Sequence, residues 1–306
     1  MVPPAVVRRL VYLGTPAIAV PPLYALSEAG FEIPLVVTNR DKRRGRGKDL
    51  DPTPVKRAAQ KLDIAVTHRV TDALEVEADL GVVVAFGRLI KPAVLDNLAM
   101  VNIHFSLLPR WRGAAPLERA ILAGDTETGV CLMELAYELD SGGVYDRRVV
   151  PIPADATLES LREDLVAAAC PLLVERLRAG LGEAVPQEGE ITWAAKIHAG
   201  DMQVDFNKPA VHTERLTRIG RAWTMLGRKR LVLHDVRAHD IQTGEHARRL
   251  APGELSVVEE SVHVGTSDGV LELLRIQPEG KAAMDARSWV NGARLQPGQR
   301  LGETNV

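Results

Sequence analysis

Residues 81–85 read Gly-Val-Val-Val-Ala, a continuous apolar run that contains three β-branched valines. A run of this kind, without polar alternation, is typical of a strand that is covered on both faces of a parallel sheet. Similar short runs stand at 10–13, Leu-Val-Tyr-Leu, and at 100–104, Met-Val-Asn-Ile-His. These three runs are therefore predicted to be buried strands of one parallel sheet.

Apolar runs alternate with amphipathic segments through the first two-thirds of the chain. Thr15-Pro16 and Thr53-Pro54 each predict a helix start, with a threonine cap followed by proline at the first helical position. Such alternation indicates an α/β fold with a doubly wound, mostly parallel, Rossmann-like sheet. The other strands are predicted at 31–38, 64–66, 130–135 and 144–152, and the other helices at 54–61, 116–123 and 157–178.

The pattern changes after residue 180. Residues 180–190 are rich in Gly, Glu and Pro, which predicts a linker, and a helix is expected at 211–222. Short apolar runs then recur about every ten residues, which indicates a small β-barrel or sandwich. These runs lie at 231–233, 253–258, 261–264 and 269–274. We expect an N-terminal domain over 1–183, a linker over 184–202 and a C-terminal domain over 203–306.

The composition excludes several classes of protein. The 306 residues are 46% hydrophobic and 25% charged, which is globular rather than disordered. Lys and Arg number 38 against 40 Asp and Glu, a net charge of −2, so any attraction for nucleic acid must be local. Cys131 and Cys170 are too few for a disulfide framework or a four-cysteine zinc site. With no apolar stretch of about 18 residues and no signal-peptide pattern, we expect a cytoplasmic protein without a metal or a membrane partner.

One local concentration of charge stands out after the predicted strand at 31–38. Residues 40–48 read Arg-Asp-Lys-Arg-Arg-Gly-Arg-Gly-Lys, in which six of nine residues are basic. Open α/β sheets keep their ligand crevice at the carboxyl ends of their strands. We therefore favour the interpretation that residues 40–48 form a phosphate-binding loop over the interpretation that they form an ordinary solvated loop. Its candidate cations are Arg40, Lys42, Arg43, Arg44, Arg46 and Lys48.

Asn102 and His104 carry the main chemical signal. Residues two apart on a strand share a face, so both side chains point the same way at the strand's carboxyl end. An amide donor beside an imidazole suits a reaction that builds an oxyanion while a proton moves. A buried Asn–His pair with satisfied hydrogen bonds is the alternative. Asp140 lies in a Leu-Asp-Ser-Gly-Gly turn and is either a partner of His104 or an ordinary turn residue.

Longer stretches carry a family resemblance. Residues 102–116 read NIHFSLLPRWRGAAP, and with Gly124-Asp125 and Leu139-Asp140 they resemble the methionyl-tRNA formyltransferases, a folate-dependent family. The resemblance covers nearly the whole chain. It extends through Gly14-Thr15-Pro16, 45–48, 52–56, the Trp-Ala-Ala-Lys-Ile of 193–197 and the Ile-Gln-Pro-Glu-Gly-Lys of 276–281.

The resemblance implies a reaction and its machinery. The family transfers the formyl group of 10-formyltetrahydrofolate to the α-amino group of methionine on initiator tRNA, for translation initiation. Asn102, His104 and Asp140 match its catalytic triad: an oxyanion donor, a proton carrier and the residue that orients the carrier. The implied fold adds an OB-like C-terminal barrel that lies along the tRNA, while the loop around Arg46 enters the acceptor stem.

The resemblance also implies a folate pocket. One group of residues matches the family's tetrahydrofolate-binding stretch, and a second group, with the loop at 136–140, would enclose the pterin. We expect no metal, no covalent enzyme intermediate and a monomer. The first group is Ser106, Leu107, Leu108 and Pro109, and the second is Phe86, Gly87, Arg88, Leu89 and Ile90.

Three features depart from the family. The basic loop lacks the prolines often found in its first half, Phe86 stands where tyrosine is common, and 220–224 lacks a proline-rich turn. Other functions remain open beside the first. They are a formyltransferase for a small amine, such as a sugar nucleotide or glycinamide ribonucleotide, a hydrolase that releases formate, and a non-catalytic folate- or RNA-binding protein. The intact triad disfavours the last.

Overall fold

The chain forms two compact units. The structure, a computed structural model, describes residues 3–43, 50–240, 250–258, 260–293, 295 and 298–302. The first unit comprises residues 1–119, 126–152 and 160–196, and the second comprises 120–125, 153–159 and 197–306. The domain limits predicted at 183 and 203 stay a prediction.

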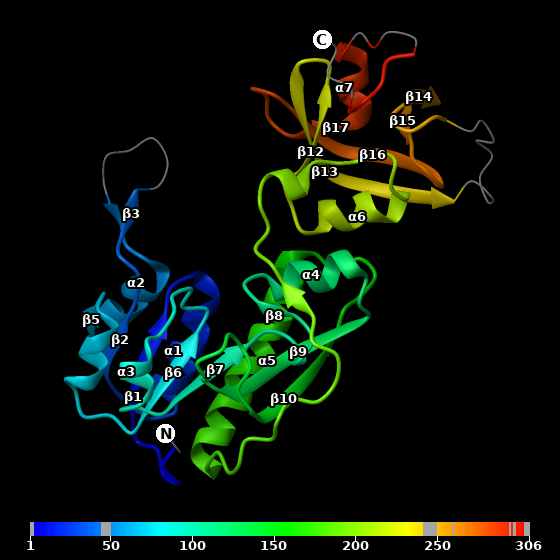
Figure 1. The fold of residues 1–306 in the computed structure, drawn as a ribbon. Coiled ribbons are helices and arrows are strands. Elements are labelled where there is room, and N and C mark those ends of the chain that lie inside the picture. Colours follow the sequence, from blue (N-terminus) through cyan, green and yellow to red (C-terminus); the bar gives the residue numbers. More distant parts are fainter. Residues whose placement is uncertain are drawn as a thin grey trace. The chain divides into compact units, whose positions relative to one another are not determined.

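A seven-stranded sheet forms the first unit (Figure 1), with the order β10-β9-β7-β6-β1-β2-β5. Five strands run parallel, and β9 and β10 add an antiparallel edge. The predicted doubly wound, mostly parallel sheet is therefore confirmed. The strands are β1 (Arg9–Gly14), β2 (Glu32–Val37), β5 (Ala65–Thr67), β6 (Leu80–Val84), β7 (Met100–His104), β9 (Glu127–Glu134) and β10 (Val144–Pro151).

The strand order reverses at β1. The chain moves from β1 to β2 and β5 on one side, and β6 and β7 lie on the other. Right-handed crossovers in the two directions place their helices on opposite faces, and the ligand crevice falls at the carboxyl ends of β1 and β6.

Among the helices of the described residues, none is long and apolar enough to cross a membrane. The first unit's helices are α1 (Val20–Glu28), α2 (Pro54–Lys61), α3 (Pro92–Leu95) and α5 (Leu158–Ala179), and α4 (Pro116–Ala123) spans both units.

The central strands are buried on both faces. All five residues of β6 and the last five of β1 are buried, which is why these runs lack polar alternation. Tyr12 on β1 is fully buried, and its hydroxyl donates a hydrogen bond to the Ala19 carbonyl at 2.5 Å. Burial raises the pKa of Tyr12. The one polar atom of this side chain is thus satisfied within the core.

The predicted cap at Thr15 is wrong. A 3-10 turn over Ala17–Ala19 leads into α1, and the residue before it, Pro16, makes no side-chain cap. The Thr15 hydroxyl instead donates to the Phe86 carbonyl at 3.2 Å. That carbonyl follows β6, so Thr15 ties together the two strand ends that flank the crevice.

The predicted cap at Thr53 is confirmed. Its Oγ1 accepts the backbone N–H of Lys56 at 3.1 Å, and it shares a buried 2.8 Å hydrogen bond with the Thr38 hydroxyl.

Replacing Thr53 by alanine is expected to lower the free energy of unfolding by about 1–2 kcal/mol, because both the cap and the partner of Thr38 are lost. Urea denaturation followed by circular dichroism measures this loss. Thr53→Ser keeps the hydroxyl and serves as the control. If serine destabilises as much as alanine, the methyl group rather than the cap is what stabilises the helix.

The second unit is an antiparallel β-structure. Its sheet has the order β12-β13-β16-β15-β14, and β17 pairs with β16. Residues 300–301 bridge the edge strand β12 to the segment that leads into β14, which closes the sheet into a small barrel. The elements are α6 (Ala210–Arg218), β12 (Ala222–Leu226), β13 (Lys229–Asp240), β14 (Leu255–Val258), β15 (Ser261–Gly265), β16 (Gly269–Pro278), β17 (Met284–Asp285) and α7 (Ala286–Ala293).

The helix predicted at 211–222 is shorter than expected. α6 ends at Arg218, and Gly220 and Arg221 both have positive φ angles, 79° and 69°. Two left-handed residues in a row terminate a helix. The chain then enters β12, a strand that the sequence pattern did not predict.

Candidate active site

A cavity of about 790 Å³ lies at the carboxyl ends of β1, β6 and β7. This is the edge of the sheet at which the topology predicts a ligand crevice. The volume falls in the range of small-molecule sites. The lining comes from residues 16–18, 83, 85–90, 102–105, 113–118 except 115, 135–140 except 138, and Arg162.

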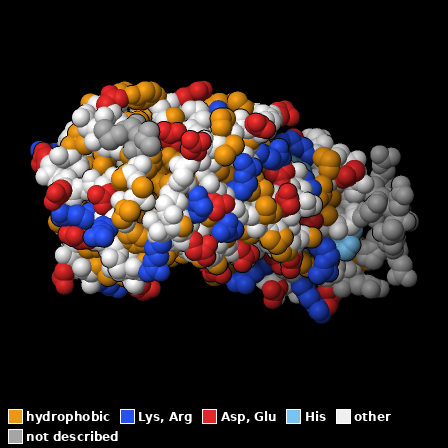
Figure 2. Space-filling view, turned by 90° about the horizontal axis from the view of Figure 1, so that it is seen from below, with side chains coloured by type: hydrophobic (Ala, Val, Ile, Leu, Met, Phe, Trp, Pro, Cys, Tyr) orange, Lys and Arg blue, Asp and Glu red, His pale blue; other side chains and the backbone are white. Residues whose placement is uncertain are grey.

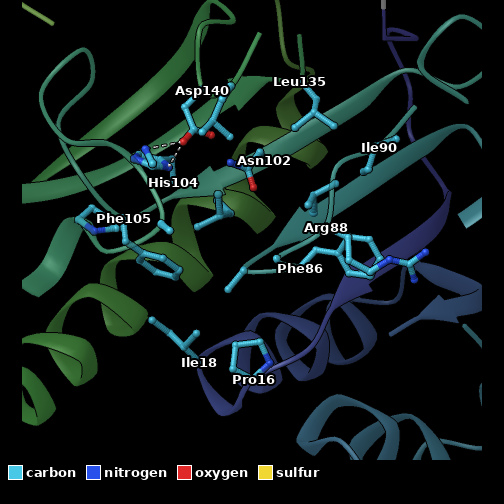
Figure 3. A pocket seen from close by; sticks show the side chains of 18 of the residues that line it. Pro16, Ile18, Phe86, Arg88, Ile90, Asn102, His104, Phe105, Leu135 and Asp140 are labelled. Carbon is cyan, nitrogen blue, oxygen red and sulfur yellow. Dashed lines mark hydrogen bonds and ion pairs between the residues drawn. The ribbon is translucent and has the colours of Figure 1, made fainter. Parts of the chain in front are cut away.

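Asn102 and His104 enter the cavity from the same face of β7 (Figure 3). The two residues are only 9% and 5% exposed. The Asn102 amide makes no hydrogen bond with another described residue. A buried amide in this state has two N–H donors and one carbonyl acceptor available to a ligand.

His104 lies between two acceptors. Its Nε2 is 2.9 Å from the Trp111 carbonyl oxygen, which can only accept, so Nε2 is the donor in this contact. Its Nδ1 is 3.6 Å from Asp140 Oδ2. That distance is too long for a hydrogen bond but short enough for strong charge interaction with a protonated ring. Asp140 Oδ2 also accepts the Gly113 backbone N–H at 2.8 Å. The structure thus brings Asn102, His104 and Asp140 together.

The two loops beside His104 have unusual backbone conformations. Trp111 and Asp140 have φ angles of 63° and 51°, in the left-handed region. Gly113 has φ 124°, and a Cβ there would lie 2.8 Å from the Ala194 carbonyl oxygen. Glycine is therefore required at 113, and the two left-handed residues must be held by their surroundings.

The predicted pterin-side turn lines the cavity with all five of its residues, 86–90. Phe86 is buried, and its carbonyl accepts the Asn39 side-chain N–H at 3.1 Å as well as the Thr15 hydroxyl. Arg88 donates to the His68 carbonyl at 2.8 Å, and its guanidinium carbon is 5.4 Å from the centre of the Phe86 ring. Backbone and side-chain contacts thus fix the shape of this wall.

The predicted folate-binding stretch at 106–109 does not line this cavity. The Ser106 hydroxyl donates to the Arg110 carbonyl at 2.6 Å, and Leu108 is buried with Cys131, Met133 and Val144. The chain turns away from the cavity after Phe105, which gives these residues a supporting position. Contact of Ser106, Leu107, Leu108 and Pro109 with folate stays a prediction.

Sequence reasoning missed two charged residues of the lining. Glu118 lies in the first turn of α4, and Arg162 lies on α5. Neither makes a hydrogen bond or ion pair with another residue in the described part of the chain. Glu118 follows the segment 102–116, which carries the family resemblance, by two residues, and this proximity could have suggested that it lies near the site. No spacing relates Arg162 to the triad.

The basic loop is partly described. Arg40 and Lys42 are exposed, and β3 (Lys42–Arg43) pairs with β4 (Leu50–Asp51). Asp41 contacts the Lys56 ammonium at 2.5 Å, and this hydrogen bond lowers the pKa of Asp41. The single acidic side chain of 40–48 is thus neutralised. Arg44, Arg46 and Lys48 lie outside the described residues, as does the side chain of Arg43.

Neither cysteine lines the cavity. Cys131 is buried and Cys170 half-buried, and burial raises the pKa of both thiols, that of Cys170 to about 11. A thiolate nucleophile is therefore not supplied by these residues. In the described ranges, no three His, Cys, Asp or Glu side chains are grouped to hold a metal ion.

Known proteins are similar to this chain over nearly all of its length. Residues 8–177 match the formyl transferase family, and residues 196–294 match its C-terminal domain. A methionyl-tRNA formyltransferase of Jannaschia sp. (strain CCS1) is 40% identical over 310 residues, which cover 96% of this chain and 99% of that protein. This chain belongs to the methionyl-tRNA formyltransferase family. Another member, from Cutibacterium acnes, is 38% identical and is also covered over 99% of its length.

Solved structures share the fold of the family. The sugar 3N-formyl transferase WlaRD is similar with a TM-score of 0.65 at 17% identity, over 90% of this chain and 99% of that chain. A methionyl-tRNA formyltransferase from Clostridium thermocellum has a TM-score of 0.55 at 13% identity, over 78% and 95%. HypX from Aquifex aeolicus has a TM-score of 0.61 at 20% identity, and this chain spans about half of it, 49%. At these identities the likeness shows the fold alone.

Proposed function

We propose that this chain transfers the formyl group of 10-formyltetrahydrofolate to the α-amino group of methionine on initiator tRNA, for the initiation of translation. The observation that carries the proposal is 40% identity over nearly the full length to proteins named for this reaction. The meeting of Asn102, His104 and Asp140 at one cavity supports it.

The cavity fits a reduced folate. It is large enough for a planar heterocycle, has the apolar side chains of Phe86, Leu89 and Ile90 in one wall, and presents the unpartnered amide of Asn102. The loop at 135–140 supplies the opposite wall, with Leu135 and Asp140 (Figure 3). When bound, 10-formyltetrahydrofolate supplies the electrophilic formyl carbon.

Asn102 would act on the formyl oxygen. As an amine attacks a formyl group, negative charge develops on the carbonyl oxygen. A preorganised amide N–H directed at that oxygen stabilises the charge without reorganisation. The open hydrogen-bonding capacity of Asn102, a side chain that is only 9% exposed, suits this role.

His104 would take up the proton that the amine loses. With Nε2 donating to the Trp111 carbonyl, the lone pair of the neutral ring is on Nδ1, on the side of Asp140. Protonation at Nδ1 gives an imidazolium whose two N–H groups face the Trp111 carbonyl and the Asp140 carboxylate. Asp140 thereby stabilises the charged ring and fixes its orientation.

A formyl-transfer assay with three acceptors tests the proposal. Methionyl initiator tRNA, methionyl elongator tRNA and free methionine are each supplied with 10-formyltetrahydrofolate. We expect transfer to the initiator tRNA alone. Formate release, or transfer only to a sugar nucleotide or glycinamide ribonucleotide added as a fourth acceptor, would contradict it.

The basic loop is proposed to bind the tRNA backbone. Side chains of both signs are interspersed on the face drawn in Figure 2, which agrees with the net charge of −2. Attraction of a polyanion therefore needs a local source. The ion pair of Asp41 with Lys56 leaves the exposed cations Arg40 and Lys42 without a competing carboxylate in their own segment.

Replacing Arg46 by alanine is expected to lower kcat/KM for tRNA and to reduce the slope of log(kcat/KM) against log[salt] by about one. Steady-state rates at several salt concentrations measure both effects. KM for the folate should not change. Lys61→Ala removes an exposed cation from the end of α2 and is the matched control. An unchanged rate and an unchanged salt dependence would remove the loop from tRNA binding.

Two further expectations belong to the same proposal. Similarity of 196–294 to the family's C-terminal domain supports a tRNA-binding role for the predicted domain at 203–306. We also propose that the protein acts as a monomer in the cytoplasm. Sedimentation at micromolar concentration, with and without tRNA, tests the monomer.

A further inference from the structure

Gln187 lies in the segment that composition predicts to be a linker, yet its side chain makes four hydrogen bonds. Its Nε2 donates to the carbonyls of Asp140, at 2.9 Å, and Gly142, at 2.8 Å. Its Oε1 accepts from Arg112 Nε at 3.0 Å and Nη2 at 2.7 Å. Both donors and both lone pairs of the amide are thus in use.

These bonds join the two loops that contact His104. Arg112 directly follows Trp111, whose carbonyl accepts from His104 Nε2. Asp140 contacts His104 Nδ1 from the other loop. The Gln187 side chain therefore connects the two residues that face the His104 ring. It bonds to the guanidinium of Arg112, next to Trp111, and to the backbone carbonyl of Asp140.

The same segment holds the first loop at further points. Thr192 accepts the Trp111 backbone N–H on its hydroxyl at 2.8 Å and the Arg112 N–H on its carbonyl at 2.9 Å. β11 (Trp193–Ala194) pairs in parallel with β8 (Arg112–Gly113). Within this segment, Thr192 and β11 contact only the loop that contains Trp111, whereas Gln187 also bonds to the turn that contains Asp140. Gln187 thus adds to the direct hydrogen bond from the Gly113 N–H to the Asp140 carboxylate.

The backbone around His104 needs such support. Trp111 and Asp140 are both in left-handed conformations, which are unfavourable for residues other than glycine. Arg112 is 6% exposed, so its guanidinium requires acceptors inside the protein. A glutamine meets both needs, because it accepts from Arg112 and donates to the carbonyls. A glutamate would accept equally well but would place an oxygen against two carbonyl oxygens.

We propose that Gln187 is a positioning residue of the active site. By linking Arg112 to the Asp140 turn, it fixes the positions of the Trp111 carbonyl and the Asp140 carboxylate relative to His104. Because these two groups contact the two ring nitrogens, Gln187 also fixes the orientation of the imidazole. The kinetic consequence rests on the proposed formyl transfer. The orientation of the ring does not.

Kinetics give the first test. Gln187→Ala is expected to lower kcat by about 10- to 100-fold with smaller changes in either KM, since small misplacements of a reacting group have effects of this size. Glu188→Ala, an exposed neighbour, is the matched control and should be unchanged. In a His104→Ala background, Gln187→Ala should have no further effect on kcat. An equal further loss in that background would overturn the proposal.

Gln187→Glu separates positioning from general destabilisation. It keeps the contact with Arg112, and when protonated it regains one donor for the carbonyls. Its rate relative to wild type should therefore rise as the pH falls, whereas that of Gln187→Ala should not. A ratio that does not depend on pH would contradict the role of the donor.

An NMR measurement keeps the inference independent of the acceptor substrate. The ring nitrogen shifts of His104, assigned with His104→Ala, should move in Gln187→Ala while those of His198 stay fixed. If wild type fails to formylate tRNA but the shifts move, the proposed function fails and the positioning stands. Unmoved shifts overturn the positioning whatever the activity.

Discussion

Replacing His104 by alanine is expected to lower kcat for formyl transfer by a factor on the order of 10²–10⁴. The variant loses the group that takes up the proton of the attacking amine and leaves Asp140 without the imidazole it faces. Affinity for tRNA should be nearly unchanged, because His104 is 5% exposed and lies inside the cavity. Single-turnover rates with saturating tRNA and folate measure the loss.

The control for His104 is a second histidine of the same unit. His68 donates a hydrogen bond from Nδ1 to the Thr38 carbonyl oxygen, 3.1 Å away, and does not line the cavity. His68→Ala should keep kcat within about threefold of wild type, as expected of a residue outside the reacting groups. If tRNA binding collapses in His104→Ala as far as the rate does, His104 is structural and the assignment fails.

Replacing Asn102 by alanine is expected to lower kcat by about 10²–10³-fold, the usual effect of removing one oxyanion donor. The amide is 9% exposed and makes no bond to another described residue, so little structure depends on it. Melting temperature should therefore change little while the rate falls. Rapid-quench kinetics together with thermal unfolding separate the two effects.

Two further variants sharpen the test of Asn102. Asn102→Asp keeps the shape but places negative charge where the formyl oxygen becomes negative, so it should be at least as slow as alanine. Asn97→Ala removes an exposed amide that donates to the Ala93 carbonyl and is the matched control. A fully active Asn102→Asp would show that no oxyanion forms beside this residue.

The sheet was predictable because its strands are buried on both faces. For that reason the sequences of β6 and β1 are unbroken apolar runs. The start of α2 was predictable from Thr53 because this residue caps a backbone N–H only three residues further along the chain. The helix cap predicted at Thr15 was wrong because the Thr15 hydroxyl donates to the carbonyl of Phe86, 71 residues away, instead of capping its own helix. β12 was missed because its start depends on two left-handed residues, Gly220 and Arg221, that leave no periodic signal.

The candidate site was predictable only in part. The period of a strand placed Asn102 and His104 on one face, but nothing in the spacing joined Asp140 to them, and only the family resemblance did so. The contacts that hold the loops of Trp111 and Asp140 in place were not predicted from the sequence. β8 and β11 have two residues each, and Gln187 stands among Gly, Glu and Pro residues typical of a linker. Contacts between short, distant segments have no pattern in the sequence.

The late position of Gln187 and β11 has a consequence for biosynthesis. A nascent chain emerges from its N-terminus, and units of structure form as they become complete. Asn102, His104 and Asp140 are all made before Gln187, which follows Arg112 by 75 residues. A chain that stops short of Gln187 would carry every reacting side chain and lack the amide bridge between Arg112 and Asp140. The full rate would therefore require synthesis past Ala194, well after the last strand of the seven-stranded sheet has been made.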